Sequence, residues 1–223
     1  MTGRAFWLGM GDIHDDISLL RRIPDLDSAS GIVVSGDLTI KGGVAAAKRV
    51  IEAIRGVNPV ILAQIGNMDK AEVDAYLTGE GINIHATGRV TAQGVGFFGC
   101  GWSTPTPFGT PSEAGEDRIG AWLEAAYETV AHCPHLVLVS HTPPLGTATD
   151  RVGAGTHVGS RAVRDFIERV QPDVCLTGHI HESTAMDTLG RTVVVNPGAL
   201  AAGGYARIEL GPEGLSARLC RIV

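Results

Sequence analysis

Short apolar runs of this chain end, one after another, in side chains that bind metal ions. The runs cover residues 5–10, 31–35, 60–65, 136–140 and 174–177, and glycine or polar residues bound each of them. Runs of this length and composition are typical of buried β-strands. The polar side chains that follow them are Asp12 and His14, Asp37, Asn67 and Asp69, His141, and His179 and His181. A single Asp after a strand is usually a turn or cap residue, so the joint arrangement carries the argument.

Helical patterns separate several of these runs. Residues 15–22 predict a short helix, and apolar residues at Val44, Ala47, Ile51 and Ile54 form the stripe of a second helix. This alternation with the first three runs predicts a parallel βαβαβ unit.

The second half of the chain continues the alternation. A longer stripe over residues 119–130 precedes the fourth run, and Ser160 can cap a helix that Pro172 ends. Residues 82–101 and a C-terminal hairpin over residues 205–223 read as β-structure. The carboxyl ends of strands in an open α/β sheet meet in one crevice, so we expect the polar side chains to converge there.

The order of these motifs resembles the calcineurin-like metallophosphoesterases. The motifs are D-x-H from Asp12, G-D ending at Asp37, G-N-x-D over residues 66–69, a lone His141, and G-H-x-H over residues 178–181. The segments SHTPP, GTHVGS, GHIHE and NPG after residue 139 are most similar to the small prokaryotic branch of that family. The resemblance implies an α/β fold, a four-layer α/β/β/α sandwich of two mixed sheets flanked by helices, here as a single domain over residues 1–223.

The resemblance also implies a dinuclear metal site. One ion would be held by Asp12, His14, Asp37 and His181, and the other by Asp37, Asn67, His141 and His179, with Asp37 as the bridge. Imidazole, carboxylate and amide ligands without cysteine suit Mn, Fe, Zn or Ni, whereas Mg alone fits poorly. Seven ligands around two divalent transition-metal ions leave open coordination positions, as a catalytic site requires.

These residues predict a metal-dependent phosphoester hydrolase that uses a metal-activated hydroxide, with Asn67 and His141 as catalytic residues. One departure from the family concerns the residue after Gly66-Asn67, which is often His and is Met68 here. A thioether donates no proton, and general-acid catalysis is typically worth about 10²–10⁴-fold. We therefore expect phosphodiesters to be preferred to monoesters. The alternative is a metal-stabilised protein-interaction scaffold with little or no turnover, because similar family members without that His include one.

Two Gly- and Pro-rich segments, residues 103–117 and 142–158, are long enough to be functional loops. For the first, a lid and a solvated connection are equally favoured. The second follows His141 directly, which favours substrate contact by His157 or Arg151. His157 can donate a proton near neutral pH, so it is the candidate for the missing general acid.

Composition limits the remaining function classes. The 223 residues carry a net charge of −6 without a run of Lys or Arg, so a nucleic-acid partner is disfavoured and a small phosphoester is the expected substrate. The four cysteines form no C-x-x-C pair, which argues against a thiolate zinc site and a disulfide framework. The sequence shows neither a signal peptide nor a membrane-spanning run, so a cytoplasmic protein is expected, and association into a homo-oligomer stays open.

Overall fold

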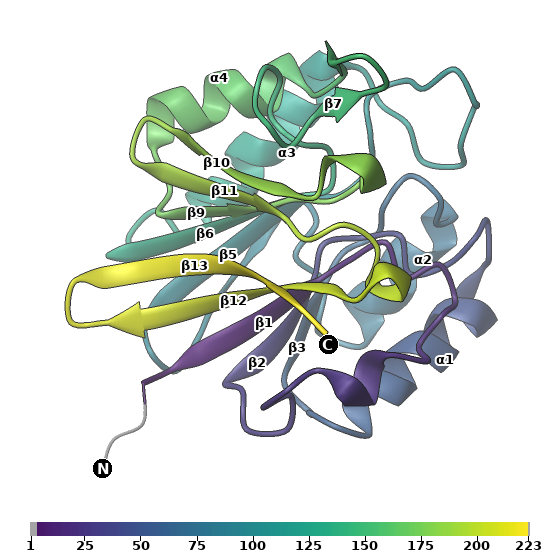
Figure 1. The fold of residues 1–223 in the computed structure, drawn as a ribbon, viewed down its shortest axis with the longest axis vertical. Helices are drawn as coiled ribbons and strands as arrows, with labels where there is room; N and C mark the ends of the chain where they lie inside the picture. The colour runs from purple at the N-terminus through teal and green to yellow at the C-terminus, as the bar shows by residue number, and fades with distance from the viewer. Residues whose placement is uncertain (1–3, 223) are drawn as a thin grey trace.

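The computed structural model describes residues 4–222, and these form two β-sheets stacked face to face with helices on both outer faces (Figure 1). The first sheet has the order β13-β12-β1-β2-β3. Its strands are β1 (Phe6–Met10), β2 (Gly31–Val34), β3 (Ile61–Ala63), β12 (Gly204–Gly211) and β13 (Gly214–Arg221). Strands β1, β2 and β3 run parallel, whereas β12 lies antiparallel to both β1 and β13, so the sheet is mixed.

The second sheet has the order β10-β11-β9-β6-β5-β4 and is also mixed. Its strands are β4 (Gly88–Val90), β5 (Val95–Cys100), β6 (His135–Ser140), β9 (Val174–Leu176), β10 (Ala185–Leu189) and β11 (Thr192–Asn196). The four central strands are parallel, and the edge strands β4 and β10 are antiparallel to their neighbours. A separate small hairpin pairs β7 (Arg151–Val152) with β8 (Thr156–His157).

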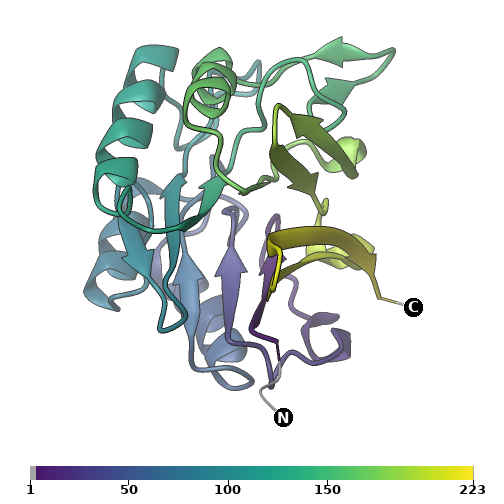
Figure 2. The same cartoon turned by 90° about the vertical axis from the view of Figure 1, so that its left-hand side faces the viewer.

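Helices form the two outer layers. The α-helices are α1 (Val44–Arg55), α2 (Ala71–Gly79), α3 (Glu116–Glu128) and α4 (Arg161–Val170), and the 3-10 helices are η1 (Leu20–Arg22), η2 (His181–Ser183) and η3 (Leu200–Ala202). One apolar cluster joins α1 and α2 to the first sheet and another joins α3 and α4 to the second. A third cluster, which includes Trp7 and Phe97 with ring centroids 5.3 Å apart, fills the space between the sheets. The α/β/β/α sandwich is therefore confirmed, and Figure 2 shows its layers from the side.

Most local predictions are confirmed. Ser160 caps α4 by accepting a hydrogen bond from the Val163 N–H at 3.2 Å. The helix ends where Gln171 takes a left-handed conformation with φ of 55°, one residue before Pro172. The C-terminal hairpin is also present, although Val223 lies outside the described residues, as do residues 1–3. No helix within residues 4–222 has the length and apolar character needed to cross a membrane.

One local prediction differs from the structure, and one helix was not predicted. The helix expected over residues 15–22 is wrong except for its last turn, which is η1. Asp15 has a φ of 65°, which is incompatible with a right-handed helix, and its carboxylate accepts a hydrogen bond from the Ile40 N–H. Helix α2 has no counterpart among the predictions, because it buries only Val73 and Leu77 and thus shows a weak stripe.

Candidate metal centre

The loops that follow five strands meet at one end of the sandwich and bring the seven predicted ligands together. Asp12 and His14 follow β1, Asp37 follows β2 and Asn67 follows β3, all in the first sheet, whereas His141 follows β6 and the pair His179 and His181 follows β9 in the second. Backbone hydrogen bonds from Asp12 to Gly36 and from His14 to Asp37 tie the first two loops to each other. The site therefore spans the boundary between the two sheets.

The backbone at this site is held in an unusual conformation. Four predicted ligands have positive φ angles, namely Asp12 (49°), His14 (49°), Asp37 (51°) and His179 (67°). Non-glycine residues adopt this region rarely, and such strain concentrates at functional sites because the surrounding structure must enforce it. Glycine is required beside them, since a Cβ at Gly66 would lie 2.2 Å from Asp37 Oδ1.

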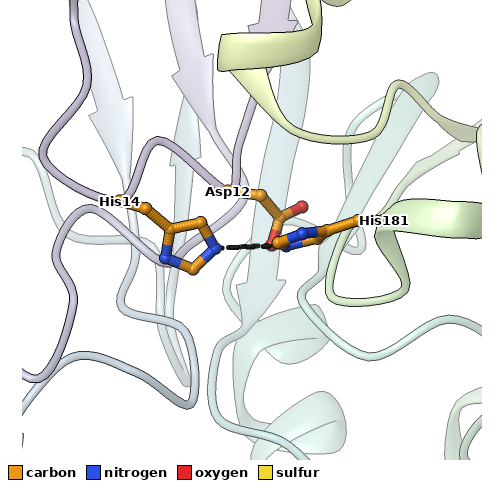
Figure 3. Close-up of side chains that lie close together, drawn as sticks. All are labelled: Asp12, His14 and His181. Carbon is orange, nitrogen blue, oxygen red and sulfur yellow. Dashed lines mark hydrogen bonds and ion pairs between the residues drawn. The ribbon is translucent and has the colours of Figure 1, made fainter.

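One half of the site consists of Asp12, His14 and His181, and we call it the exposed half. The Nε2 atoms of His14 and His181 lie 3.1 Å apart, and His181 Nε2 lies 3.2 Å from Asp12 Oδ1 (Figure 3). The two imidazole rings point toward one another beside the carboxylate. The side chains of His14 and His181 are 19% and 46% exposed, so solvent reaches this half directly. The ligand atoms of all three residues lie close enough to share one metal ion.

The other half consists of Asn67, His141 and His179, and we call it the buried half. Asn67 Oδ1 lies 2.9 Å from His141 Nε2 and 2.7 Å from His179 Nδ1. His141 is completely buried, and its Nδ1 donates to the Ser35 carbonyl at 3.2 Å. In neutral His141 the lone pair of Nε2 then faces the oxygens of Asn67 and Asp37, which repel it. A cation between these three atoms resolves the conflict, so the residues fit a metal ion.

Asp37 lies between the two halves and contacts both. Its Oδ2 lies 3.7 Å from His14 Nε2, and its Oδ1 lies 3.4 Å from His141 Nε2. The Met68 N–H donates to Oδ1 at 2.8 Å and thereby fixes the orientation of the carboxylate. One oxygen therefore faces each half, which is the geometry of a bridging ligand.

The pKa values of the site residues also indicate that its carboxylates favour a positive charge nearby. Burial lowers the pKa of the His141 imidazole, but the charge of Asp37 and its hydrogen bond outweigh this and raise the pKa to about 9. Burial likewise opposes ionisation of Asp12, yet the hydrogen bond from His181 and nearby imidazole charges lower its pKa to about 2. Burial, together with the charge of His141, lowers the pKa of His179 to about 4. Protons on His141 thus occupy a position that a metal ion would compete for.

Two carboxylates outside the ligand set hold the ligand loops in place. Buried Asp69 accepts hydrogen bonds from the N–H groups of Leu38, Thr39 and Gly66, which links the Asp37 loop to the Asn67 loop. Burial and the nearby charge of Asp37 raise the pKa of Asp69 to about 6. Asp69, the last residue of the G-N-x-D motif, thus holds the Asp37 and Asn67 loops together.

The second carboxylate, Glu113, acts on Asn67 through Thr110. Asn67 Nδ2 donates to Thr110 Oγ1 at 3.0 Å, and this hydroxyl donates to Glu113 Oε1 at 2.6 Å. Because the amide nitrogen is engaged, the amide oxygen of Asn67 must face His141 and His179. This relay orients a predicted ligand, and no motif in the sequence marks it.

A cavity of about 790 Å³ opens at the site. Besides His14, Asp37, Asn67, His179 and His181, it is lined by Lys41, Met68, Val152, Val158, Ile180, Glu182 and six residues of the loop Thr104–Thr110. The loop in residues 103–117, for which sequence favoured neither role, thus forms much of the wall. Lys41 and Glu182 were also missed, although Glu182 directly follows the G-H-x-H motif.

His157 and Arg151, the residues proposed to contact substrate, do not line this cavity. They lie opposite one another in the β7–β8 hairpin. His157 Nδ1 lies 2.6 Å from the buried Asp150 Oδ1, and Asp150 also accepts from the Gly146 and Gly159 N–H groups. The second loop therefore reaches the cavity through Val152 and Val158 instead.

Asn196 of the N-P-G turn is not a predicted ligand, but its side chain holds the backbone of the G-H-x-H motif. Its Nδ2 donates to the Ile180 carbonyl at 2.9 Å, between the two histidines of the G-H-x-H motif, and its Oδ1 accepts from the Gly198 N–H. His85 lies outside the ligand set, where its Nδ1 accepts a hydrogen bond from the Gly101 N–H at 3.1 Å and its ring contacts the Trp122 ring.

Comparisons with known proteins agree with this geometry. A family model described as metallophosphoesterase, calcineurin superfamily, matches residues 128–216. The uncharacterized protein MJ1162 of Methanocaldococcus jannaschii is 34% identical over 196 residues, which cover 85% of this chain and 86% of that protein. UPF0046 protein K07C11.7 of Caenorhabditis elegans is 32% identical over 107 residues, 48% of this chain and 34% of the relative.

The fold has close counterparts among solved structures. The crystal structure of TT1561 from Thermus thermophilus matches with a TM-score of 0.73 and 18% identity, covering 99% of this chain and 100% of that one. At that identity the match establishes the fold alone, and the family follows from the sequence comparisons. Together with the Asp and His groups that can hold divalent metal ions, these matches assign the chain to a family of metal-dependent phosphoester hydrolases. The chain belongs to the calcineurin superfamily of metallophosphoesterases, as a small protein of the prokaryotic type.

Proposed function

We propose that this chain is a dinuclear metal-dependent phosphoesterase that hydrolyses phosphodiesters in preference to monoesters. The observation that carries the proposal is Asp37, whose two carboxylate oxygens face separate groups of ligands. Mn, Fe, Zn and Ni all suit the mixture of imidazole, carboxylate and amide groups. When bound, two such ions would polarise the phosphoryl oxygens, lower the pKa of a water between them and stabilise an in-line displacement.

The residues of the chain have distinct roles in this proposal. Asp37 and the two ligand groups would fix the positions of the ions. Asn67 and fully buried His141, whose Oδ1 and Nε2 lie 2.9 Å apart, would hold the ion of the buried half, and of the two only Asn67 lines the cavity. His14 and His181 line the open side of the cavity, where with Asp12 they would hold the ion of the exposed half beside the phosphoryl group. The proton for the leaving oxygen would come from water or from a loop residue.

The preference for diesters is argued from charge and from Met68. Lys41 is the single Lys or Arg that lines the cavity within residues 4–222, and Glu182 also lines it. A diester carries one negative charge and needs less compensation than a monoester dianion. Met68 is half-buried on the cavity wall, where its thioether offers neither a proton nor a charge.

Turnover assays test this proposal directly. Metal-free protein, reloaded separately with Mn²⁺, Fe²⁺, Zn²⁺ or Ni²⁺, should hydrolyse bis(4-nitrophenyl) phosphate faster than 4-nitrophenyl phosphate. The Asp37→Asn variant serves as the control for adventitious metal in the assay. Turnover of every ester at the rate of metal ions in buffer would overturn the hydrolase and favour the scaffold.

The role of Met68 is tested by Met68→His. An imidazole at this position would face the cavity, so activity on monoesters should rise relative to diesters, by up to about 10²-fold if the ring is well placed. Metal content is measured on the same samples. An unchanged substrate ratio at unchanged metal content would show that Met68 does not set the diester preference.

The prediction that His157 is the proton donor is separate. Asp150 holds Nδ1 and leaves Nε2 available, but reaching the leaving oxygen requires movement of the β7–β8 hairpin. His157→Ala should lower kcat for an alkyl-leaving diester by about 10²-fold and barely affect a nitrophenyl ester, whose leaving group needs little protonation. Equal losses on both esters would reject the role.

A further inference from the structure

The cavity beside the metal centre has an apolar wall built from two loops. Pro105, Pro107 and Phe108 come from the loop after β5, and Val152 and Val158 come from the β7–β8 hairpin. Figure 1 shows both segments on the same side of the molecule, the loop in teal and the hairpin in green. A charged phosphate group gains no binding energy from contact with an apolar surface. We therefore expect the wall to contact another part of the ligand.

Phe108 is the most exposed large apolar side chain of this wall, with 79% of its surface accessible. A Phe at a loop tip is not explained by the core, because it belongs to none of the three apolar clusters of residues 4–222. Large exposed apolar groups that border a polar site commonly mark a binding surface. Phe108 therefore has the position and the chemistry of a ligand contact.

The loop that carries Phe108 is held in place rather than loosely attached. The Phe108 N–H donates to Thr106 Oγ1, and that hydroxyl donates to Glu113 Oε1 at 2.7 Å. Ser112 fastens the other end, because its N–H donates to the Asn67 carbonyl at 3.0 Å and its hydroxyl to the Asp69 carbonyl at 2.7 Å. Glu113, which orients the Asn67 side chain through Thr110, thus also positions the apolar wall through Thr106.

We propose that the substrate is an organic phosphodiester with at least one aromatic or extended apolar ester group, which Phe108 contacts while the phosphate lies at the metal centre. This inference rests on the proposed function and narrows it. A small polar ester group, such as glyceryl, would leave the wall in contact with water and gain nothing from it. Aromatic contact geometry with Phe108 adds to the burial of apolar surface.

Equilibrium binding provides the test, because it does not depend on turnover. Mn²⁺-loaded protein is titrated with diphenyl phosphate and with dimethyl phosphate, which share one charge and the phosphodiester core. We expect diphenyl phosphate to bind at least ~10-fold more tightly, in line with the discrimination that apolar pockets achieve. Phe108→Ala should remove most of this ratio, whereas Phe108→Leu should retain part of it.

Val90→Ala provides the matched control, because Val90 is also an exposed apolar residue, at 49%, but lies on edge strand β4 outside the cavity. Equal affinity of the two diesters in the native protein, or a ratio that Phe108→Ala leaves unchanged, would overturn the inference. The proposed function fails by a different result, the absence of bis(4-nitrophenyl) phosphate hydrolysis. The two failures are therefore distinguishable.

Discussion

The exposed and buried halves of the metal centre have similar chemistry but different surroundings. The side chains of His14 and His181 are partly exposed, and within residues 4–222 the buried Nδ1 of His14 has no hydrogen-bond partner to hold the ring. In the buried half, Ser35 fixes His141, and Thr110 with Glu113 fixes Asn67. The difference indicates that the buried half sets the geometry of the centre, whereas the exposed half can adjust to a substrate.

Asp37 is where the two halves depend on each other. Its orientation comes from the Met68 N–H, next to Asn67, so the loop of the buried half also positions the ligand that the exposed half shares. Substitutions in the buried half should therefore weaken metal binding by the exposed half. Substitutions in the exposed half should affect metal binding by the buried half less.

The largest effect should follow from Asp37→Asn, which neutralises the bridge. An amide supplies one good acceptor and no charge, so both ions should bind more weakly, by at least about 10²-fold, more than is usual for loss of an outer hydrogen bond. Elemental analysis and metal titration measure the two ions per chain expected in the native protein. Asp16→Asn, at an exposed carboxylate of the β1–β2 connection, is the control.

A single ion in fully loaded native protein would contradict the bridging role. Loss of only one ion in Asp37→Asn would show instead that the two halves are independent. Either result would show that Asp37 does not couple the two halves.

The next effect separates the halves. His179→Ala should release mainly the ion of the buried half, and His181→Ala mainly that of the exposed half, so each variant should retain about one ion. Because the buried half positions Asp37, His179→Ala should also weaken the remaining ion, whereas His181→Ala should leave its partner nearly unchanged. His132→Ala, at an exposed histidine away from the site, controls for nonspecific binding.

Isothermal titration with Mn²⁺ reads out both halves in one experiment. Identical binding curves for the two variants would contradict the asymmetry, because the ions could then not be assigned to different surroundings. If His181→Ala weakened binding of the remaining ion more than His179→Ala does, the exposed half would set the geometry of the centre instead.

Sequence reasoning selected side chains that the fold brings together, because predicted metal ligands need particular chemistry at the ends of strands. Asp12, Asp37 and His141 could be identified from residue type and from the apolar runs before them. The parallel βαβαβ unit followed from the same runs and from helix stripes such as that of α1, which buries Ala47, Val50, Ile51 and Ile54, whereas the four-layer sandwich was implied by the family resemblance. These signals are local, and a single sequence displays them.

What surrounds the ligands could not be predicted in this way. The contact between Thr110 and Asn67 joins residues 43 positions apart, and neither side chain is unusual by itself. The two loops show the same limit, because His157 suggested substrate contact while Phe108 carried no chemical signal. The position of a loop depends on its hydrogen bonds, here those to Glu113, and composition does not specify them.

The smallest effect should come from the support of Asn67. Burial opposes ionisation of Glu113, but hydrogen bonds from Thr106 and Thr110 outweigh it and lower its pKa from 4.5 to about 2. Because the folded pKa lies below the ordinary value, the charged carboxylate stabilises this loop above about pH 4.5, and that contribution is lost as the pH falls toward 2. At neutral pH the support is complete.

Glu113→Ala should therefore weaken the ion of the buried half by about 10-fold to 100-fold at neutral pH, as loss of an outer partner usually does, and leave the exposed half nearly unchanged. Glu113→Gln keeps one oxygen acceptor for the two threonine hydroxyls, so its effect should be smaller. Glu168→Gln, at a surface carboxylate paired with Arg164, is the matched control. If Glu113→Ala weakened both ions equally, the loop would support the whole centre, and the stiffness of the buried half would not come from the relay through Thr110. If neither ion were affected, Asn67 would be held by its metal alone, and the difference between the halves would reduce to solvent exposure.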